Sequence, residues 1–212
     1  MNRDRPWRST MWIGGEIMNR KLRRSHARWL NRAAISMVGL GVVLGAGLGY
    51  LQLSGNFHPV IAGEVYRSAQ PTPEALAGYI KEHRIRSIIN LRGSNSGADW
   101  YDAEVAAAKA LGLAHYDFGM SARKPLDQHR AQELIALMEK SEKPVLIHCQ
   151  GGADRSGLAS ALYVAAIAKA GEEAAERQIS LRYGHISLPM TAAYAMDETF
   201  EALEPWLGFS GS

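Results

Sequence analysis

The pattern of apolar and polar positions divides the chain near residue 53. Residues 33–53, AAISMVGLGVVLGAGLGYLQL, contain no charged side chain. As a helix rising 1.5 Å per residue, this segment is about 31 Å long, which matches the hydrocarbon thickness of a bilayer. The pattern predicts a transmembrane helix. A buried core helix and the apolar part of a cleaved signal peptide are the alternatives, and the length of the run disfavours both.

Beyond this helix, short apolar runs alternate with amphipathic stretches. Residues 54–62, SGNFHPVIA, are expected to form a linker. In the run IRSIINLR, nearly continuous apolar residues are typical of a strand buried on both faces. The alternation predicts an α/β domain over residues 63–207, with a mostly parallel central sheet flanked by helices. The predicted strands are EVYRSA, IRSIINLR, LAHYDFGM and KPVLIHC.

The predicted helices carry recognisable ends. Thr72 stands in the position of an N-cap, and Pro73 stands in the first helical position. Gly112 and Gly171 follow alanine-rich stretches, as glycine does at helix C-termini. The predicted helices are QPTPEALAGYIKEH, ADWYDAEVAAAKALG, LDQHRAQELIALMEKS, SGLASALYVAAIAKAG, Glu172–Tyr183 and Thr191–Leu203.

The net charge of +3 is unevenly distributed. Residues 1–32 carry nine arginines and lysines against two carboxylates, which leaves +7 for this basic tail and −4 for residues 33–212. Positive residues flanking an apolar helix stay on the cytoplasmic side. We therefore expect a single-pass membrane protein, anchored by residues 33–53, with a cytoplasmic N-terminus and an extracytoplasmic, periplasmic domain. The domain has no basic stripe, so nucleic acid is not an expected partner.

Cys149 is the only cysteine of the chain. A single cysteine excludes an intramolecular disulfide and a cysteine-rich metal site. The thiol is therefore either a buried structural group or a reactive one. It stands in HCQGGADRSG, directly after the apolar run PVLI. Open α/β sheets place their sites at the carboxyl ends of strands, and this position favours the reactive group.

The residues of HCQGGADRSG suit the binding of a tetrahedral anion. Gly151 and Gly152 allow successive backbone N–H groups to turn toward a common centre. A helix beginning near Arg155 adds free N–H donors, and the guanidinium fits a phosphate. The same surroundings favour the thiolate form of a cysteine. The segment lacks the Gly-Lys-Ser/Thr of a nucleotide-binding loop, and His148 with Cys149 has no second ligand pair for zinc.

The pattern His148-Cys149-x5-Arg155-Ser156 resembles the signature of the cysteine-dependent protein tyrosine and dual-specificity phosphatases, and residues 148–157 are called the signature loop from here on. The similarity covers residues 60–205, through VYRSAQPTPEAL, SIINLR and HYDFGMSA, and looks most like the bacterial dual-specificity-like branch. It implies a hydrolase acting on phosphotyrosine, phosphoserine, phosphothreonine or a small phosphate monoester. No metal or cofactor is implied.

The resemblance also implies roles for individual residues. Cys149 attacks phosphorus and forms a phosphocysteine intermediate. Ser156 eases the departure of the sulfur in the second step, and His148 orders the loop. Arg155 binds phosphoryl oxygens and stabilises the transition state. Phosphate-binding backbone N–H groups are implied at Gln150, Gly151, Gly152, Ala153, Asp154 and Arg155.

An aspartate that protonates the leaving oxygen is a further implication of the resemblance. Asp117 stands 32 residues before Cys149, a separation common in the family, and is the first candidate. Asp127 stands 22 residues before it and is equally suited to cap the following helix. Asp154 is the third candidate, with a loop-fixing salt bridge as its alternative role. The absence of a dedicated acid is the remaining alternative.

Arg67 and Arg92 close the first two predicted strands. Each is expected either to contact phosphate or substrate or to form a surface salt bridge, whereas His185 is expected to be structural. Signature loops that act on phosphoinositides often carry lysines where this chain has Gln150 and Asp154. Phosphoinositides and inositol phosphates are therefore the alternative substrate class.

Two other kinds of protein fit parts of the pattern. A rhodanese-like sulfurtransferase also places a cysteine in an anion-binding loop, but the spacing from cysteine to Arg155 disfavours it. A membrane-tethered phospho-binding module without catalysis is the alternative from a different class. The presence of both Cys149 and Arg155 disfavours this second alternative.

Overall fold

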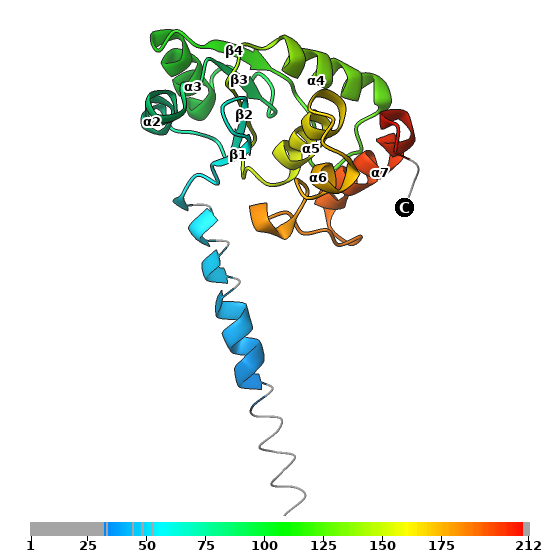
Figure 1. Cartoon of the computed structure of the whole chain (residues 1–212). Coiled ribbons are helices and arrows are strands. Elements are labelled where there is room, and N and C mark those ends of the chain that lie inside the picture. The colour runs from blue at the N-terminus through cyan, green and yellow to red at the C-terminus, as the bar shows by residue number, and fades with distance from the viewer. Residues whose placement is uncertain (1–31, 33, 44, 48, 52, 210–212) are drawn as a thin grey trace, which may run out of the picture. The chain divides into compact units, whose positions relative to one another are not determined.

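The structure is a computed structural model that describes residues 32, 34–43, 45–47, 49–51 and 53–209 (Figure 1). Apart from Arg32, the predicted basic tail lies outside the described residues. The chain divides into two compact units, Met1–Leu48 and Gly49–Ser212. An apolar helix over Ala34–Leu51 has a mean hydropathy of 1.9 and is long and apolar enough to cross a membrane.

The second unit is built on a five-stranded sheet in the order β1-β2-β5-β3-β4. Four strands are parallel to their neighbours, and only the edge strand β1 is antiparallel. This confirms the predicted α/β class with a mostly parallel sheet. The strands are β1 (His58–Ile61), β2 (Val65–Ser68), β3 (Ser87–Asn90), β4 (Ala114–Asp117) and β5 (Val145–His148).

Helices cover both faces of the sheet (Figure 1). The apolar side chains of Ile88 and Leu146 pack toward α2 and α3, whereas those of Ile89 and Ile147 pack toward α4, α5 and α7. This division follows from the alternation of side chains along a strand. The helices are α2 (Pro73–His83), α3 (Asp99–Ala110), α4 (Gln128–Lys140), α5 (Asp154–Leu162), α6 (Glu172–Glu176) and α7 (Ala195–Leu207).

The strand register brings several loops to one edge of the sheet. Ser68 at the end of β2 pairs with His148 at the end of β5. His148 also pairs with Asn90, and Asn90 pairs with Asp117. These four residues are the last of their strands, so the segments after them leave the sheet together. Cys149 follows β5 and therefore lies in the middle of this edge.

The predicted start of α2 and end of α3 are confirmed, whereas Gly171 is the N-cap of α6 and does not end the helix before it. The Thr72 side chain accepts a hydrogen bond from the backbone N of Ala75 at 3.2 Å, and Pro73 opens α2. The helix expected near Arg155 begins at Asp154 and continues as a π-helix over Tyr163–Ile167.

The predicted linker at residues 54–62 contains a strand. Its residues His58–Ile61 form β1, with His58 opposite Arg67 and Ile61 opposite Val65. Pro59 is compatible with this strand, because proline is tolerated in an edge strand, where one side needs no ladder hydrogen bonds. The folded domain therefore begins closer to the apolar helix than the sequence indicated.

The helix predicted over Glu172–Tyr183 is wrong beyond its first turns. Helix α6 ends at Glu176, and a separate 3-10 turn, η2, covers Leu181–Tyr183. The carbonyl of Gln178 accepts a hydrogen bond from Arg67 at 2.7 Å, so a tertiary contact replaces the helical one. The helix predicted over Thr191–Leu203 is shifted, because a 3-10 turn, η3 (Ala192–Tyr194), precedes α7.

Candidate active site

The signature loop makes a tight turn between β5 and α5. Gly152 has a φ of +69°, and a Cβ there would lie 2.5 Å from the backbone N of Ala69. Only glycine tolerates both this conformation and this close approach. The loop therefore packs directly on the backbone that follows β2.

The thiol of Cys149 lies at the floor of the loop and is 3% exposed. The backbone N–H of Gly152 donates to Sγ at 3.2 Å, and the hydroxyl of Ser156 lies 3.5 Å from the same sulfur. Hydrogen-bond donors at these positions stabilise negative charge on sulfur. Ser156 therefore lies where its implied role requires it.

Arg155 projects from the first turn of α5. Its Nη1 lies 3.5 Å from the carbonyl oxygen of Leu91 and 3.4 Å from that of Met120, which are long contacts. Its Nε is buried and has no hydrogen-bond partner within the described part of the chain. A guanidinium with an unused buried donor can accept an anionic ligand.

Arg67 supports the loop from behind, and both expectations for it are wrong. Its side chain is 0% exposed, so it neither forms a surface salt bridge nor faces a ligand. It donates to the carbonyls of Gly152 at 3.0 Å, Ala153 at 2.9 Å and Gln178 at 2.7 Å. Burial lowers the pKa of this guanidinium to about 10, which leaves it charged at neutral pH.

Asn56 supports the loop beside Arg67. Its Nδ2 donates to the carbonyl of Gly151 at 3.0 Å and to that of Tyr183 at 2.8 Å. Its Oδ1 lies 3.0 Å from Nε2 of His58. Asn56 is 1% exposed, so its amide binds the loop, η2 and β1 together in the interior.

His148 is held by a buried carboxylate on α3. Its Nε2 lies 3.1 Å from Oε1 of Glu104, and Nε2 of His115 lies 2.7 Å from the same oxygen. Gln70 donates to the other oxygen of Glu104. Burial alone would raise the pKa of Glu104, but the hydrogen bonds from His115 and His148 outweigh burial and lower it to about 2. The charged Glu104 thereby fixes the first residue of the loop.

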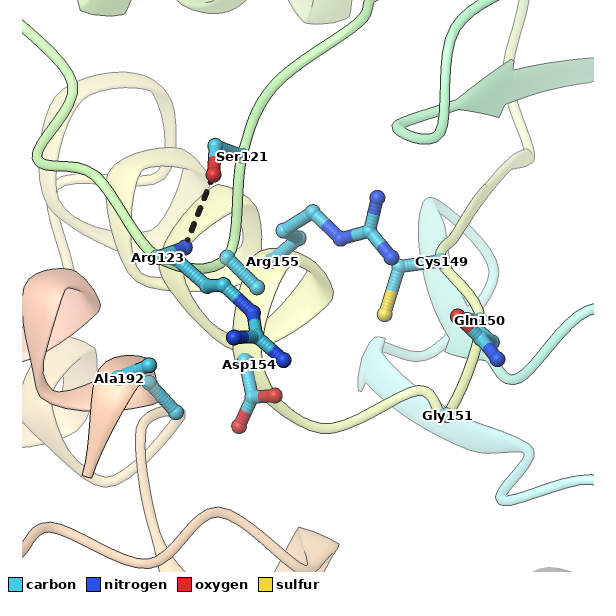
Figure 2. A pocket seen from close by; sticks show the side chains of 10 residues that line it. Ser121, Arg123, Cys149, Gln150, Gly151, Asp154, Arg155 and Ala192 are labelled. Carbon is cyan, nitrogen blue, oxygen red and sulfur yellow. Dashed lines mark hydrogen bonds between the residues drawn. The ribbon is translucent and has the colours of Figure 1, made fainter. Parts of the chain in front are cut away.

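A cavity of about 590 Å³ opens above Cys149 (Figure 2). Two arginines and one carboxylate reach it from different elements, namely Arg155 and Asp154 from α5 and Arg123 from the segment after β4. Figure 2 shows the side chains of these residues directed into the same space. The cavity is lined by Ser121, Ala122, Arg123, Cys149, Gln150, Gly151, Asp154, Arg155, Ala192 and Ala193.

Asp117 ends β4 and is not among the residues that line the cavity. Its carboxylate accepts hydrogen bonds from Nδ2 of Asn90 at 2.8 Å and from the hydroxyl of Tyr101 at 2.5 Å. Asp127 also lies outside the lining, and its side chain accepts a hydrogen bond from the backbone N of Arg130 at 2.8 Å. Asp127 is therefore the N-cap of α4.

Asp154 is the aspartate that lines the cavity, and a buried histidine holds it. Oδ1 of Asp154 lies 2.8 Å from Nδ1 of His185, whose Nε2 lies 2.8 Å from Oδ2 of Asp197. Burial alone would lower the pKa of His185, but hydrogen bonds to Asp154 and Asp197 outweigh burial and raise it. The imidazole of His185 therefore bridges the side chains of Asp154 and Asp197.

Arg92 lies beside the signature loop without lining the cavity. Its guanidinium carbon is 3.3 Å from the ring centroid of Trp100, and Nη1 donates to Oε1 of Gln70 at 2.8 Å. Burial and the nearby Arg155 lower the pKa of Arg92. Arg92 forms no salt bridge within the described part of the chain, and its contact with phosphate or substrate stays a prediction.

Sequence reasoning missed several residues of the site, among them Asn56, Glu104, Arg123 and Asp197. Glu104 offered a signal, because it falls on the same face of its helix as Tyr101 and Ala108, where an apolar residue is expected. Asn56 and Asp197 offered none, since their contacts are with residues far away in the sequence.

Residues 65–197 match the family model PTP-SAK, described as a Swiss Army Knife protein, DSP-PTPase phosphatase domain. A comparison with curated proteins found no match.

Solved structures share the fold. TpbA from P. aeruginosa superimposes with a TM-score of 0.57 at 18% identity, over 73% of this chain and 92% of TpbA. A variant of TpbA in complex with pTyr superimposes with a TM-score of 0.54 at 19% identity, over 71% of this chain and 91% of the variant. The catalytic core of the PP-IP phosphatase SIW14 from S. cerevisiae was solved with citrate. It superimposes with a TM-score of 0.52 at 20% identity, over 72% of this chain and 93% of the SIW14 core.

Proposed function

The chain belongs to the cysteine-dependent DSP-PTPase phosphatase family, and from that premise we propose that it is a membrane-anchored enzyme that hydrolyses phosphate monoesters through a phosphocysteine intermediate. One observation carries the mechanism. Sγ of Cys149 lies at the floor of the cavity with the N–H of Gly152 and the hydroxyl of Ser156 beside it. The unpartnered Nε of Arg155 supports the binding of phosphoryl oxygens.

The reaction has two displacements at phosphorus. In the first, the thiolate of Cys149 forms an S–P bond while the P–O bond to the leaving group breaks. In the second, water attacks phosphorus, the P–S bond breaks, and inorganic phosphate is released. Ser156 donates to the departing sulfur, and Arg155 with the backbone N–H groups binds the charged oxygens in both transition states.

We assign the proton transfers to Asp154, because it is the candidate aspartate that lines the cavity. Its carboxyl gives a proton to the leaving oxygen and takes one from water in the second displacement. His185 is a positioning residue, because its hydrogen bond occupies Oδ1 and leaves Oδ2 for the cavity. The role of Asp117 as the acid remains a prediction, and the comparison of aspartate variants described below tests it.

The first experiment is phosphate release from p-nitrophenyl phosphate by the full chain in detergent, with EDTA present. We expect metal-independent turnover that Cys149→Ser lowers by more than roughly a thousand-fold. Arg155→Lys should lower it strongly, whereas the matched control Arg86→Lys, in an exposed ion pair, should not. If folded native protein shows no turnover, the phospho-binding alternative takes its place, and phosphopeptide binding becomes the next assay.

A second experiment distinguishes the three aspartates. Protonation of the leaving oxygen matters most for substrates with basic leaving groups. Removal of the acid should therefore lower turnover of phenyl phosphate more than turnover of p-nitrophenyl phosphate. We expect Asp154→Asn to lower turnover of phenyl phosphate roughly a hundred-fold or more. Asp127→Asn is the control, because asparagine also caps helices. A selective loss with Asp117→Asn instead would transfer the role to that residue.

Phosphotyrosine is the substrate that we favour. A structure of TpbA contains pTyr, and SIW14 is described as a PP-IP phosphatase, so both substrate classes occur among proteins of this fold. The carboxylate of Asp154 in the cavity disfavours a head group with many phosphates, because like charges repel. A phosphotyrosine peptide and an inositol hexakisphosphate compared under equal conditions test this preference.

Residues 33–53 anchor the enzyme in this proposal, with a cytoplasmic tail and an extracytoplasmic domain. The apolar helix Ala34–Leu51 and the +7 charge of residues 1–32 support it. The test is protease digestion of spheroplasts that express the chain with a C-terminal epitope. Loss of the epitope without lysis supports this topology, and its survival until lysis contradicts it.

A further inference from the structure

The segment at residues 181–190, between α6 and α7, presents apolar side chains to solvent. After residue 53, the large apolar side chains that are strongly exposed are Leu111, Trp206 and four others, and those four all belong to this segment. Such clustering marks a contact surface, whereas single exposed apolar residues do not. The four are Leu181 at 55%, Ile186 at 42%, Leu188 at 52% and Met190 at 94% exposure.

Polar contacts fix the segment in this outward-facing arrangement. His185 is 1% exposed and binds Asp154 and Asp197. The Ser187 hydroxyl donates to Asp197 at 2.6 Å, and the Thr191 hydroxyl donates to the carbonyl of Leu188 at 2.9 Å. These contacts hold the segment in place from the inside, through the buried His185, while Leu181, Ile186, Leu188 and Met190 remain exposed.

The same segment is bonded to the chain directly after the apolar helix. Asn56 donates through its side chain to the carbonyl of Tyr183 at 2.8 Å and through its backbone N to the carbonyl of Leu51 at 2.8 Å. Asn56 lies five positions after Leu51, at most roughly 17 Å along the chain. Leu53, between them, is 92% exposed. Asn56 therefore ties the 181–190 segment to the stretch of chain that directly follows the apolar helix.

The charge around the segment suits a lipid surface. Arg182 is exposed within the segment, and Arg177, which forms an ion pair with Glu173, is exposed before it. Apolar side chains flanked by arginines are typical of elements that lie in the interface of a bilayer, where the apolar groups enter the acyl boundary and the arginines face anionic head groups.

We propose that the 181–190 segment docks on the bilayer surface in the leaflet where the apolar helix ends. This inference rests on the membrane anchoring in the proposed function. Ala192 and Ala193, directly after the segment, line the cavity of Cys149. The cavity therefore opens next to the lipid head groups rather than toward the bulk solution.

The test uses the full chain in nanodiscs of phosphatidylcholine and phosphatidylglycerol. In a Cys149→Ser background, Met190→Cys provides a single thiol for an environment-sensitive fluorophore. The matched control is Leu111→Cys, an exposed apolar position after α3. We expect emission from position 190 to shift to shorter wavelength and to fall roughly two-fold with brominated lipids, with no change at position 111. Melting temperatures establish that both variants are folded.

If the chain resists carbonate extraction but the fluorophores at positions 190 and 111 give equal, unquenched emission, the docking of the segment is overturned. Extraction of the chain by carbonate overturns the anchoring itself, and the docking with it. These outcomes are distinguishable because extraction reports on the apolar helix and fluorescence reports on the segment. Quenching that disappears with Leu188→Asp but persists with Leu111→Asp would show that the apolar side chains of the segment make the contact.

Discussion

The two sides of the signature loop are built in opposite ways. Behind the loop, Arg67 and Asn56 donate to its carbonyls from the interior, and Glu104 binds His148. In front, Nε of Arg155 has no partner among the described residues, and Arg123 is exposed at the cavity. Folding therefore fixes the shape of the loop from behind and leaves donors unused in front. A preorganised site of this kind needs little rearrangement when an anion binds.

The largest expected effect comes from breaking the close packing behind the loop. Gly152→Ala places a Cβ 2.5 Å from the backbone N of Ala69 and 2.7 Å from the carbonyl carbon of Ser68. Both neighbours are backbone, so the loop must move. We expect turnover of p-nitrophenyl phosphate to fall more than roughly a hundred-fold, with a lower melting temperature. Gly97→Ala, with a comparable φ and nothing within 4 Å, is the control for backbone strain alone.

The next largest effect is expected from Arg67, the buried cation behind the loop. Arg67→Met keeps much of the side-chain volume but leaves the carbonyls of Gly152, Ala153 and Gln178 without their donor. We expect a loss of about 3 kcal/mol in the free energy of unfolding, measured in urea, and a lower kcat. An unchanged kcat in folded protein would show that the loop keeps its shape without this support.

A smaller and pH-dependent effect belongs to Glu104. Its folded pKa of about 2 lies below the ordinary value of 4.5, so its charge stabilises the fold above about pH 4.5, and this contribution is lost as the pH falls toward 2. Glu104→Gln should cost about 2 kcal/mol at pH 7 and show a weaker loss between pH 4.5 and 3 than the native chain. Parallel acid profiles for both proteins would contradict this account.

The smallest effect is expected in front of the loop. Arg123 is exposed, and its described hydrogen bond is made by its backbone N to Ser121 at 3.0 Å. Arg123→Ala should leave the melting temperature unchanged and raise KM several-fold, because it removes only attraction for the anionic substrate. A large loss of stability would show that Arg123, on the cavity side of the loop, also supports the fold.

The sequence predicted the sheet, the loop and the position of the thiol because these depend on local signals. PVLI predicts a buried strand, and the glycines predict a turn. The support behind the loop depends on contacts over long separations, such as Asn56 with Gly151 and with Tyr183. Such contacts leave no periodic pattern, and this is why Arg67 was expected either at the ligand or in a surface salt bridge.

The aspartates show the same limit. Spacing along the chain favoured Asp117, yet the register of β3 and β4 places it beside Asn90, where Tyr101 also binds it. Asp154, which we propose as the acid, contacts a histidine 31 residues later, and such a contact leaves no local signal in the sequence.

Cys149 is the only cysteine of the chain, and this makes it a convenient group for chemical titration. A thiol-selective reagent consumed by the native protein reports on this one sulfur, without correction for other cysteines. Titration with such a reagent therefore counts the molecules whose nucleophile is still a reduced thiol. The thiol is 3% exposed in the folded chain, so a rise in its labelling rate also reports opening of the loop.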